Sequence, residues 1–229
     1  MEYHVIERLP FRINAEELAA RLKVEGSLYG EFEAICREAV DVANPKLLYA
    51  RAEIDSLEGG RAVVGGMRFT SKVLCVNLRD VKATYPYVAT GGRELHDLSM
   101  SKDDPLERYW IDSIAERILM EGLAGGRAAV AGREGTGELC AMNPGSLPDW
   151  PISEQRPLFE LLGDVMGRIG VELTDSCLMI PIKSCSGLFF ESSEHYSNCS
   201  LCPRDMCPGR REPFNEALAL TKYGLGDDS

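Results

Sequence analysis

Apolar residues recur every three or four positions in four stretches of the chain, which is the spacing of one buried helix face. The four stretches are residues 13–23, 28–42, 104–123 and 158–169. Asn14 is placed to cap the first of them, and Asp104, Pro105 and Glu107 give the third a capped start. The pattern therefore predicts four amphipathic helices.

The stretches between these helices are strand-like or irregular. The predicted strands are residues 47–54, 84–92, 171–182 and 188–190, and residues 69–78 are a predicted short helix. Residues 122–137 hold six glycines and are predicted to form a loop or loose hairpin; they lack the Gly-Lys-Ser/Thr ending of a phosphate loop. Because helices and strands do not alternate, the order favours an α+β fold over a doubly wound sheet.

Composition narrows the class of protein without naming it. Of 229 residues, 45% are hydrophobic and 27% are charged, which is ordinary for a folded domain. The net charge of −11 argues against binding to nucleic acid, whose phosphates require clustered Lys and Arg. No stretch reads as a signal peptide or a membrane span, so the sequence predicts a cytoplasmic protein with no membrane partner.

Several motifs follow the glycine-rich stretch in a recognisable order. The loop "NPGSLPDWP" precedes the predicted helix 158–169, and "GVELTDS" and "SCSG" follow it. In this order they resemble the reactivation, or activation, domain of cobalamin-dependent methionine synthase, in a stand-alone version. That family has a Pro-Gly loop, an amphipathic helix, a Leu-Thr-x-Ser motif and a Ser-Val-Ser-Gly turn. The resemblance covers residues 27–196.

The resemblance implies an α+β domain around a bent, mostly antiparallel sheet with flanking helices. It also implies a reactivator of a corrinoid-dependent methyltransferase. The family's domain binds S-adenosylmethionine and docks on a corrinoid-binding protein or methyltransferase, while an electron donor such as ferredoxin or flavodoxin reduces cob(II)alamin. Methylation then traps the reduced cobalt. The chain has no Asp-x-His-x-x-Gly motif, so cobalamin would arrive only on a partner.

Part of the family's ligand site can be carried over to this sequence. Asp112 and Glu116, four positions apart on the predicted third helix, are candidates for the acidic residue that faces the ligand's ammonium. The other matching positions are Pro144, Gly145, Ser184, Ser186, Gly187 and Tyr196. Two anchors of the family differ, because Ala141 stands in the place of an Arg and Ser146 in the place of a Tyr.

Beyond Tyr196 the chain departs from the family pattern and places three cysteines close together. Cys199, Cys202 and Cys207 are spaced C-x2-C-x4-C in "NCSLCPRDMCPGRR". Thiolates bind zinc and iron–sulfur clusters, and the neighbouring arginines would offset their charge. In a reducing compartment such cysteines point to a metal or to redox chemistry rather than to a disulfide framework.

A closed metal site needs a fourth ligand. Cys185 is the first choice because it replaces the family's valine, and Cys177 and His195 are the reserves. A 4Fe-4S cluster is preferred, since a reactivator must deliver an electron to cobalt. Structural zinc, and free or redox-active thiols without a metal, stay open.

Three parts of the chain follow from this reading: an N-terminal helical segment (1–26), an activation-like domain (27–196), and a cysteine-rich segment with the tail (197–229). The alternative function is a non-catalytic binding module of the same fold, braced by zinc. The absent Arg and Tyr favour this module, whereas a redox cluster would favour the reactivator. The module would dock on a corrinoid protein or on another partner, and whether the chain is itself part of a methyltransferase enzyme stays open.

Overall fold

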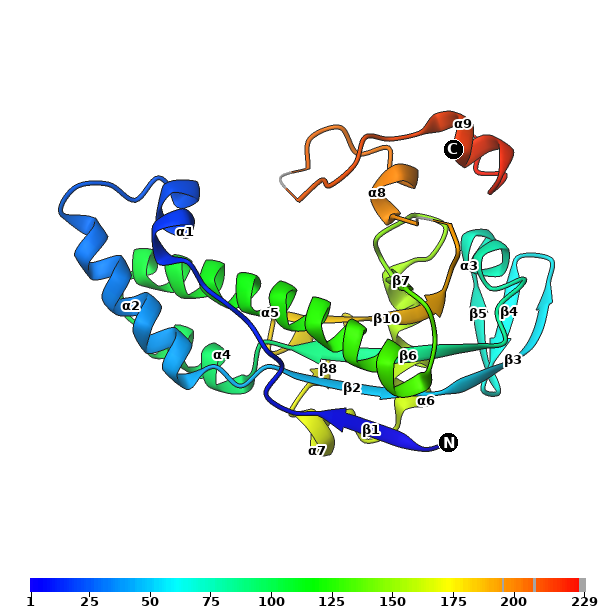
Figure 1. Cartoon of the computed structure of the whole chain (residues 1–229), viewed down its shortest axis with the longest axis horizontal. Helices are drawn as coiled ribbons and strands as arrows, with labels where there is room; N and C mark the ends of the chain where they lie inside the picture. The colour runs from blue at the N-terminus through cyan, green and yellow to red at the C-terminus, as the bar shows by residue number, and fades with distance from the viewer. Residues whose placement is uncertain (195, 208, 227–229) are drawn as a thin grey trace.

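The structure is a computed structural model that describes residues 1–194, 196–207 and 209–226. Its main element is a curled sheet of eight strands in which every neighbouring pair is antiparallel (Figure 1). The strands of this sheet are β1 (Tyr3–Ile6), β2 (Lys46–Ala50), β3 (Ala52–Glu58), β4 (Arg61–Val64), β5 (Met67–Thr70), β6 (Ala83–Thr90), β7 (Leu139–Met142) and β10 (Ser184–Glu191). A small hairpin of β8 (Glu172–Leu173) and β9 (Met179–Ile180) stands apart from it.

The helices flank this sheet, so the predicted α+β class with a bent antiparallel sheet is confirmed. The long helices are α1 (Ala15–Leu22), α2 (Leu28–Val42), α4 (Arg93–Ser101), α5 (Pro105–Glu134) and α6 (Gln155–Leu162). The short ones are α3 (Lys72–Asn77), α7 (Val165–Ile169), α8 (Asn198–Leu201), α9 (Glu216–Thr221) and the 3-10 turn η1 (Ile152–Glu154). Among the described residues no helix is both long and apolar enough to cross a bilayer.

Strand β6 is the centre of the sheet. It pairs with β10 along one side, and with β2 and then β3 along the other. This strand contains Pro86, which has no backbone N–H. A proline in a central strand therefore removes one hydrogen bond from the ladder. The register places Pro86 between the residues paired with β2 and those paired with β3, so the missing N–H falls where the neighbouring strand changes.

Helix α5 crosses one face of the sheet and corrects the prediction for residues 122–137. Four of the six glycines lie within α5, which continues unbroken to Glu134, and the other two, Gly135 and Gly137, follow its end. A Cβ at Gly126 would stand 3.1 Å from Leu9 Cδ2, and one at Gly125 would stand 3.0 Å from Pro10 Cγ. The glycines therefore let the segment that leaves β1 pack directly on the helix backbone, and this packing outweighs their low helix propensity.

Helices α6 and α7 cover the opposite face. The leucines of α6, with Val165 and Ile169 of α7, join the sheet residues Leu48, Val88 and Leu188 in one apolar cluster. The sequence predicts a single helix over residues 158–169, but the chain breaks at Gly163, whose φ is +70°. The apolar spacing of the two helices is the same as that of one, so periodicity alone does not reveal the break.

The N-terminal half of α5 extends beyond the sheet and packs with α1, α2 and α4 in a helical arm (Figure 1). The predicted caps of this arm are confirmed. Asn14 Oδ1 accepts from Glu17 N, and Asp104 Oδ1 accepts from Leu106 N, with Pro105 in the first turn. The predicted N-terminal helical segment 1–26 contains α1 but also β1, which pairs with β2.

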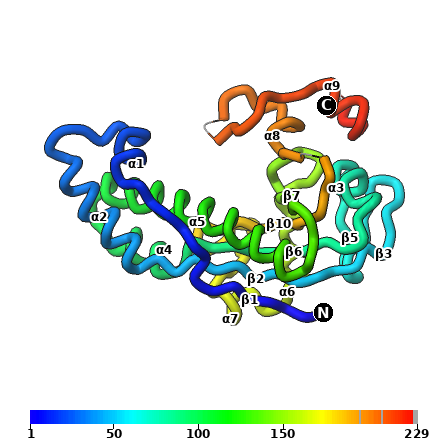
Figure 2. Tube along the Cα trace, in the orientation of Figure 1, coloured from blue at the N-terminus to red at the C-terminus, as the bar shows by residue number. Residues whose placement is uncertain are grey.

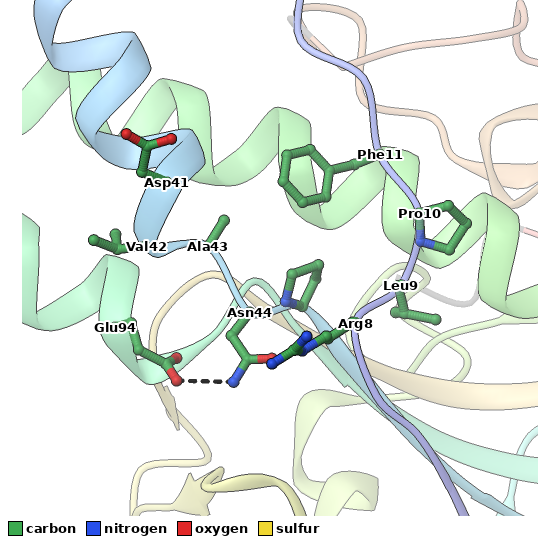
Figure 3. A pocket seen from close by; sticks show the side chains of 10 residues that line it. Arg8, Leu9, Pro10, Phe11, Asp41, Val42, Ala43, Asn44 and Glu94 are labelled. Carbon is green, nitrogen blue, oxygen red and sulfur yellow. Dashed lines mark hydrogen bonds between the residues drawn. The ribbon is translucent and has the colours of Figure 1, made fainter.

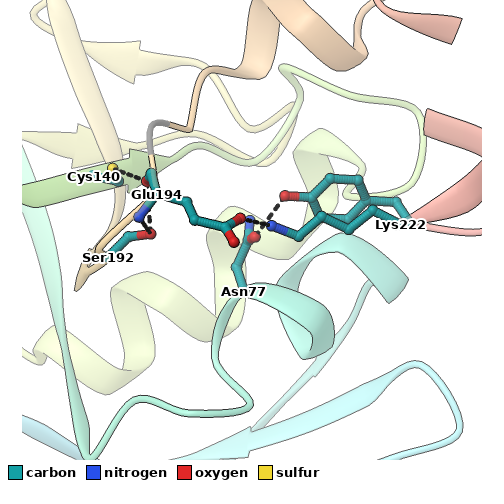
Figure 4. A network of polar contacts seen from close by, with 6 residues as sticks. Asn77, Cys140, Ser192, Glu194 and Lys222 are labelled. Atoms are coloured by element: carbon teal, nitrogen blue, oxygen red, sulfur yellow. Dashed lines mark hydrogen bonds and ion pairs between the residues drawn. The ribbon is translucent and has the colours of Figure 1, made fainter. Parts of the chain in front are cut away.

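The C-terminal segment folds back over the molecule near α3 and β7 (Figure 2). Leu201, Ala219 and Tyr223 join the large apolar cluster of the sheet. Polar contacts hold the same segment in place (Figure 4): Tyr223 donates to Asn77 at the end of α3, and Lys222 pairs with Glu194. Lys222 lowers the pKa of Glu194, and Glu194 raises that of Lys222. The cysteine-rich segment is thus attached to the domain at both of its ends.

Candidate functional site

The Pro-Gly loop forms a tight, well-tied turn after β7. Gly145 has φ +83° and donates its N–H to the carbonyl of Trp150 at 2.7 Å. A Cβ at Gly145 would lie 2.7 Å from Ile152 Cδ1, so both the conformation and the space demand glycine. Asp149 accepts from the N-terminal amides of α3, which fixes the far side of the loop. Pro144 is buried, whereas Gly145 and Ser146 are exposed.

Strand β10 passes unusually close to the start of this loop. A Cβ at Gly187 would stand 2.2 Å from the carbonyl oxygen of Met142 and 2.7 Å from Asn143 Nδ2. Real side chains do not make contacts of this length, so Gly187 allows the two backbones to approach. The predicted glycine thus has a clear structural task beside the loop.

Asn143 connects the loop to three other parts of the chain. Its Nδ2 donates to Tyr87 Oη at 2.7 Å and to the carbonyl of Ser186 at 2.8 Å. Its Oδ1 accepts from Asn198 Nδ2 at 3.1 Å, and Asn198 Oδ1 in turn accepts from Tyr196 Oη at 2.8 Å. Tyr196, predicted for the ligand surface, is therefore linked to the Pro-Gly loop through Asn198.

The sequence analysis did not find Asn143 or Asn198. An Asn before Pro-Gly reads as part of a turn, and an Asn before a cysteine reads as a helix cap. Their pairing joins positions 55 residues apart, and no local pattern indicates it.

Two buried polar atoms beside the loop have no hydrogen-bond partner among the residues that the structure describes. They are Gln155 Oε1 and Trp150 Nε1, on side chains that are only 4% and 3% exposed. The other end of the Gln155 amide donates to Ser186 Oγ at 3.1 Å. Buried polar atoms are nearly always paired, so an orphaned acceptor and an orphaned donor mark a place where water or a ligand completes the structure.

The two serines of the predicted site already have partners. Ser184 Oγ donates to the carbonyl of Pro181 at 2.7 Å and lies 3.0 Å from Thr90 Oγ1, where β10 begins beside the end of β6. Ser186 is buried and receives the Gln155 amide. Both hydroxyls therefore position β10 relative to its neighbours.

The acidic candidates lie on the exposed side of α5. Asp112 accepts from Ser99 Oγ of α4 at 3.0 Å, which holds it within the helical arm. Glu116 Oε2 stands 3.7 Å from Lys183 Nζ, on the residue directly before Ser184. The contacts thus join Glu116, but not Asp112, to the start of β10.

The buried phenols and thiol beside Asn143 are held in their neutral forms. Burial raises the pKa of Tyr87 and of Tyr196 well above the ordinary value for tyrosine, and the neighbouring Cys185 adds to the effect at Tyr87. Burial also raises the pKa of the Cys185 thiol, although the Tyr87 hydroxyl and Arg211 act in the opposite direction. This part of the site can donate hydrogen bonds but holds no anion of its own.

The predicted metal ligands do not form a metal centre in the described part of the chain. No group of three or more His, Cys, Asp or Glu side chains within it is placed to hold an ion. Cys185 faces Tyr87 Oη at 3.8 Å and Asn143 Nδ2 at 3.4 Å, and the reserve Cys177 lies in the turn between β8 and β9. The other reserve, His195, lies outside the described residues. The described residues thus hold no assembled metal site, and the metal on these cysteines stays a prediction.

Cys199 differs from Cys185 in its surroundings. Its own burial would raise the pKa of the thiol, but hydrogen bonds from the backbone and side chain of Arg211 outweigh this and lower the pKa. Cys199, Cys202 and Cys207 are all partly exposed and unpaired with one another. They stand where a solvent reagent can reach them.

A hollow of about 630 Å³ is lined by residues other than the predicted site residues. It is bounded by the segment Arg8–Phe11 and the connection from α2 to β2, with Glu94 at one side (Figure 3). Asn44 Nδ2 donates to Glu94 Oε1 there at 2.9 Å. The hollow is shallow and mixed in charge, and none of the predicted site residues lines it.

The family comparison matches the segment that contains the Pro-Gly loop. Residues 141–208, from β7 through the Pro-Gly loop, β10 and the cysteines, match the family described as "Vitamin B12 dependent methionine synthase, activation domain". The resemblance to this family that the sequence motifs predict is thereby confirmed over residues 141–208.

A solved structure, the MetH reactivation domain bound to AdoHcy, has the same fold. It matches with a TM-score of 0.52 at 17% identity, over 86% of this chain and 81% of that one. A search of curated proteins found no match.

Proposed function

We propose that the chain is an accessory protein for a corrinoid-dependent methyltransferase and supports reductive reactivation of cob(II)alamin. The observation that carries this proposal is that the family match covers the hydrogen-bonded Pro-Gly loop. Residues 141–208 contain the Pro-Gly turn, the close approach at Gly187 and the two orphaned polar atoms. The solved neighbour was bound to AdoHcy, which makes S-adenosylmethionine the proposed ligand here.

The ligand would bind at the surface formed by the loop and β10. The N–H groups of Gly145 and Ser146 already donate to Trp150 and Asn143, so this exposed turn would offer its carbonyl oxygens to a ligand. Gln155 Oε1 would offer a further acceptor. Glu116, beside the start of β10, is the proposed partner of the ligand's ammonium. Pro144, Ser184, Ser186, Gly187 and Tyr196 would shape this surface, and Asp112 is the less favoured acidic candidate. When bound, S-adenosylmethionine supplies the methyl group that traps reduced cobalt on the partner.

A second candidate, a binding module that has lost methyl transfer, is favoured by one observation. Ala141 and Ser146 replace the Arg and Tyr anchors of the family, and Ala141 is held within β7 opposite Phe189. An arginine clamps a carboxylate by two parallel hydrogen bonds, and alanine provides none. Under this candidate the chain would still dock on a corrinoid protein.

Titration calorimetry of the full chain with S-adenosylmethionine and AdoHcy separates the two candidates. Measurable binding of both ligands supports the reactivator, and no binding at millimolar ligand supports the module. Ser146→Tyr restores one family anchor at an exposed position and should raise the affinity about tenfold, equivalent to roughly 1.4 kcal/mol. Ser153→Tyr, an equally exposed serine in the 3-10 turn after the loop, is the matched control and should leave affinity unchanged.

The iron–sulfur or zinc centre on Cys185, Cys199, Cys202 and Cys207 stays a prediction, as do the electron donor and the cytoplasmic location. Anaerobic purification followed by an absorption spectrum and by iron, zinc and sulfide analysis would test the metal. Broad absorption near roughly 400 nm with bound iron would indicate a cluster. A colourless protein without stoichiometric metal would rule out both the iron–sulfur cluster and the zinc site.

A further inference from the structure

Cys199 and Cys202, the first two cysteines of the C-terminal segment, are the first and last residues of one tight turn. The N–H of Cys202 donates to the carbonyl of Cys199 at 3.3 Å, which closes a four-residue turn. Such a turn holds its first and last Cα atoms within about 7 Å, and a disulfide spans Cα distances of about 4.4–6.8 Å. Residues three apart in a helical turn also point to the same side.

The turn is fixed from outside by groups that do not involve the thiols. One Arg210 nitrogen donates to the carbonyl of Cys199 at 3.2 Å, and the other donates to that of Cys202 at 3.1 Å. Ser200 binds Glu212 through its hydroxyl and Asn215 through its carbonyl, at 2.6 and 2.8 Å. These bonds fix the backbone of the turn without using either thiol.

We propose that Cys199 and Cys202 form a dithiol–disulfide pair that exchanges with low-molecular-weight disulfides such as oxidised glutathione. The surroundings assign the roles, because Cys202 packs against the large apolar cluster of the sheet, whereas Cys199 is not among the residues that do. Cys199 is therefore the attacking thiol and Cys202 is the resolving one. Cys207, separated from the turn by the exposed stretch 203–206, is not part of the pair.

The exchange proceeds in two steps. The Cys199 sulfur attacks one sulfur of oxidised glutathione, so a mixed disulfide forms and one glutathione leaves. The Cys202 sulfur then attacks Cys199, the internal disulfide forms and the second glutathione leaves. The two thiol protons of the protein end on the two glutathione molecules. The protein dithiol is oxidised by two electrons and one oxidised glutathione is reduced, and each step is ordinary thiol–disulfide exchange.

The test is a thiol count on the full chain across a series of reduced to oxidised glutathione ratios. The protein is quenched in acid, alkylated and digested with trypsin, which releases residues 184–204 with Cys185, Cys199 and Cys202 and separates them from Cys207. In reducing buffer this peptide should carry three alkyl groups. In oxidising buffer it should carry one, on Cys185, with no bound glutathione.

Three variants check the assignment. Cys202→Ser should trap glutathione on Cys199 and raise the mixed disulfide at least about tenfold over the parent chain, because the resolving thiol is gone. Cys199→Ser should abolish the internal disulfide. Cys207→Ser is the matched control and should leave the thiol count of the peptide unchanged. Circular dichroism of each variant confirms that the chain is folded.

Several results would overturn the proposal. They are three alkyl groups at every glutathione ratio in a folded protein, a disulfide that includes Cys185 or Cys207, or a bound metal that protects these cysteines from alkylation. Each of these outcomes is independent of S-adenosylmethionine binding. The disulfide proposal can therefore be disproved while the proposed function stands, and the proposed function can be disproved while the disulfide proposal stands.

Discussion

The two sides of the candidate site are built in opposite ways. The loop side, made of Asn143, Gly145, Gln155, Ser186 and Gly187, is mostly buried, and each polar side chain on it has at least one fixed partner. The helix side, made of Asp112 and Glu116 on α5, is exposed, and its contacts are one hydrogen bond and one loose ion pair.

The loop side thus determines the shape of the site, and the helix side supplies its negative charge. A buried network costs free energy if any member is removed, because the partners left behind lose hydrogen bonds that water cannot replace. An exposed carboxylate contributes little to the free energy of unfolding, and it acts on a ligand mainly through its negative charge. Substitutions on the loop side should therefore affect stability first, and substitutions on the helix side should affect ligand affinity almost alone.

Gly187→Ala should have the largest effect. Its methyl group would overlap the carbonyl of Met142, so β10 and the loop must separate, at a cost of about 3 kcal/mol or more in the free energy of unfolding. Gly132→Ala is the control, since nothing lies within 4 Å of a Cβ there and the helix favours alanine. Urea denaturation of both variants checks this. Equal stability of the two variants would contradict the close approach.

Asn143→Ala should destabilise the protein by about 2 kcal/mol, because the Ser186 carbonyl and the Asn198 amide would lose their partner inside the protein. Asn44→Ala, which removes an exposed bond to Glu94, should cost about 0.5 kcal/mol. Thermal unfolding followed by circular dichroism compares the two. A loss at Asn143 no greater than at Asn44 would mean that the network does not support the loop.

Gln155→Met should separate affinity from stability. It removes an unpaired acceptor together with a single bond to Ser186, so the free energy of unfolding should change by less than about 1 kcal/mol. If Gln155 Oε1 contacts the ligand, the affinity for S-adenosylmethionine should fall about tenfold. Calorimetry and urea denaturation on the same preparation measure both quantities. Unchanged affinity would assign the orphaned acceptor to water.

Glu116→Gln should have the smallest effect on stability, within about 0.5 kcal/mol, because its pair with Lys183 is exposed. The affinity for S-adenosylmethionine should fall roughly fivefold and become less dependent on salt. Asp112→Asn is the matched control and should change affinity less than about twofold. The opposite order in calorimetry would place Asp112, rather than Glu116, beside the ligand.

Local patterns predicted the parts of this molecule that depend on neighbours in the chain. The caps at Asn14 and Asp104 and the strand predicted over residues 84–92 need only adjacent residues. The structure has both caps and a strand over Ala83–Thr90. The continuation of α5 through Gly125 and Gly126 was missed, because its cause is Leu9 and Pro10, more than a hundred residues away in the chain.

The same reasoning divides the candidate site. The motif around Pro144 and Gly145 is readable because a Pro-Gly turn is a local structure. The network through Asn143 is not readable, since its partners come from β6, β10 and α8. The metal or redox chemistry indicated by the cysteine spacing stays a prediction, and spacing alone does not show that Arg210 holds the carbonyls of Cys199 and Cys202.

The pairing of β6 with β10 has a consequence for synthesis of the chain. Thr84 and Phe189, joined by a hydrogen bond, are 105 positions apart, and all eight residues of β6 are buried in the finished sheet. At roughly 5–20 residues per second, β10 leaves the ribosome roughly 5–20 seconds after β6. During that interval β6 has an open, apolar edge that another nascent chain can pair with. Chains that terminate before residue 184 should therefore need a chaperone to stay in solution.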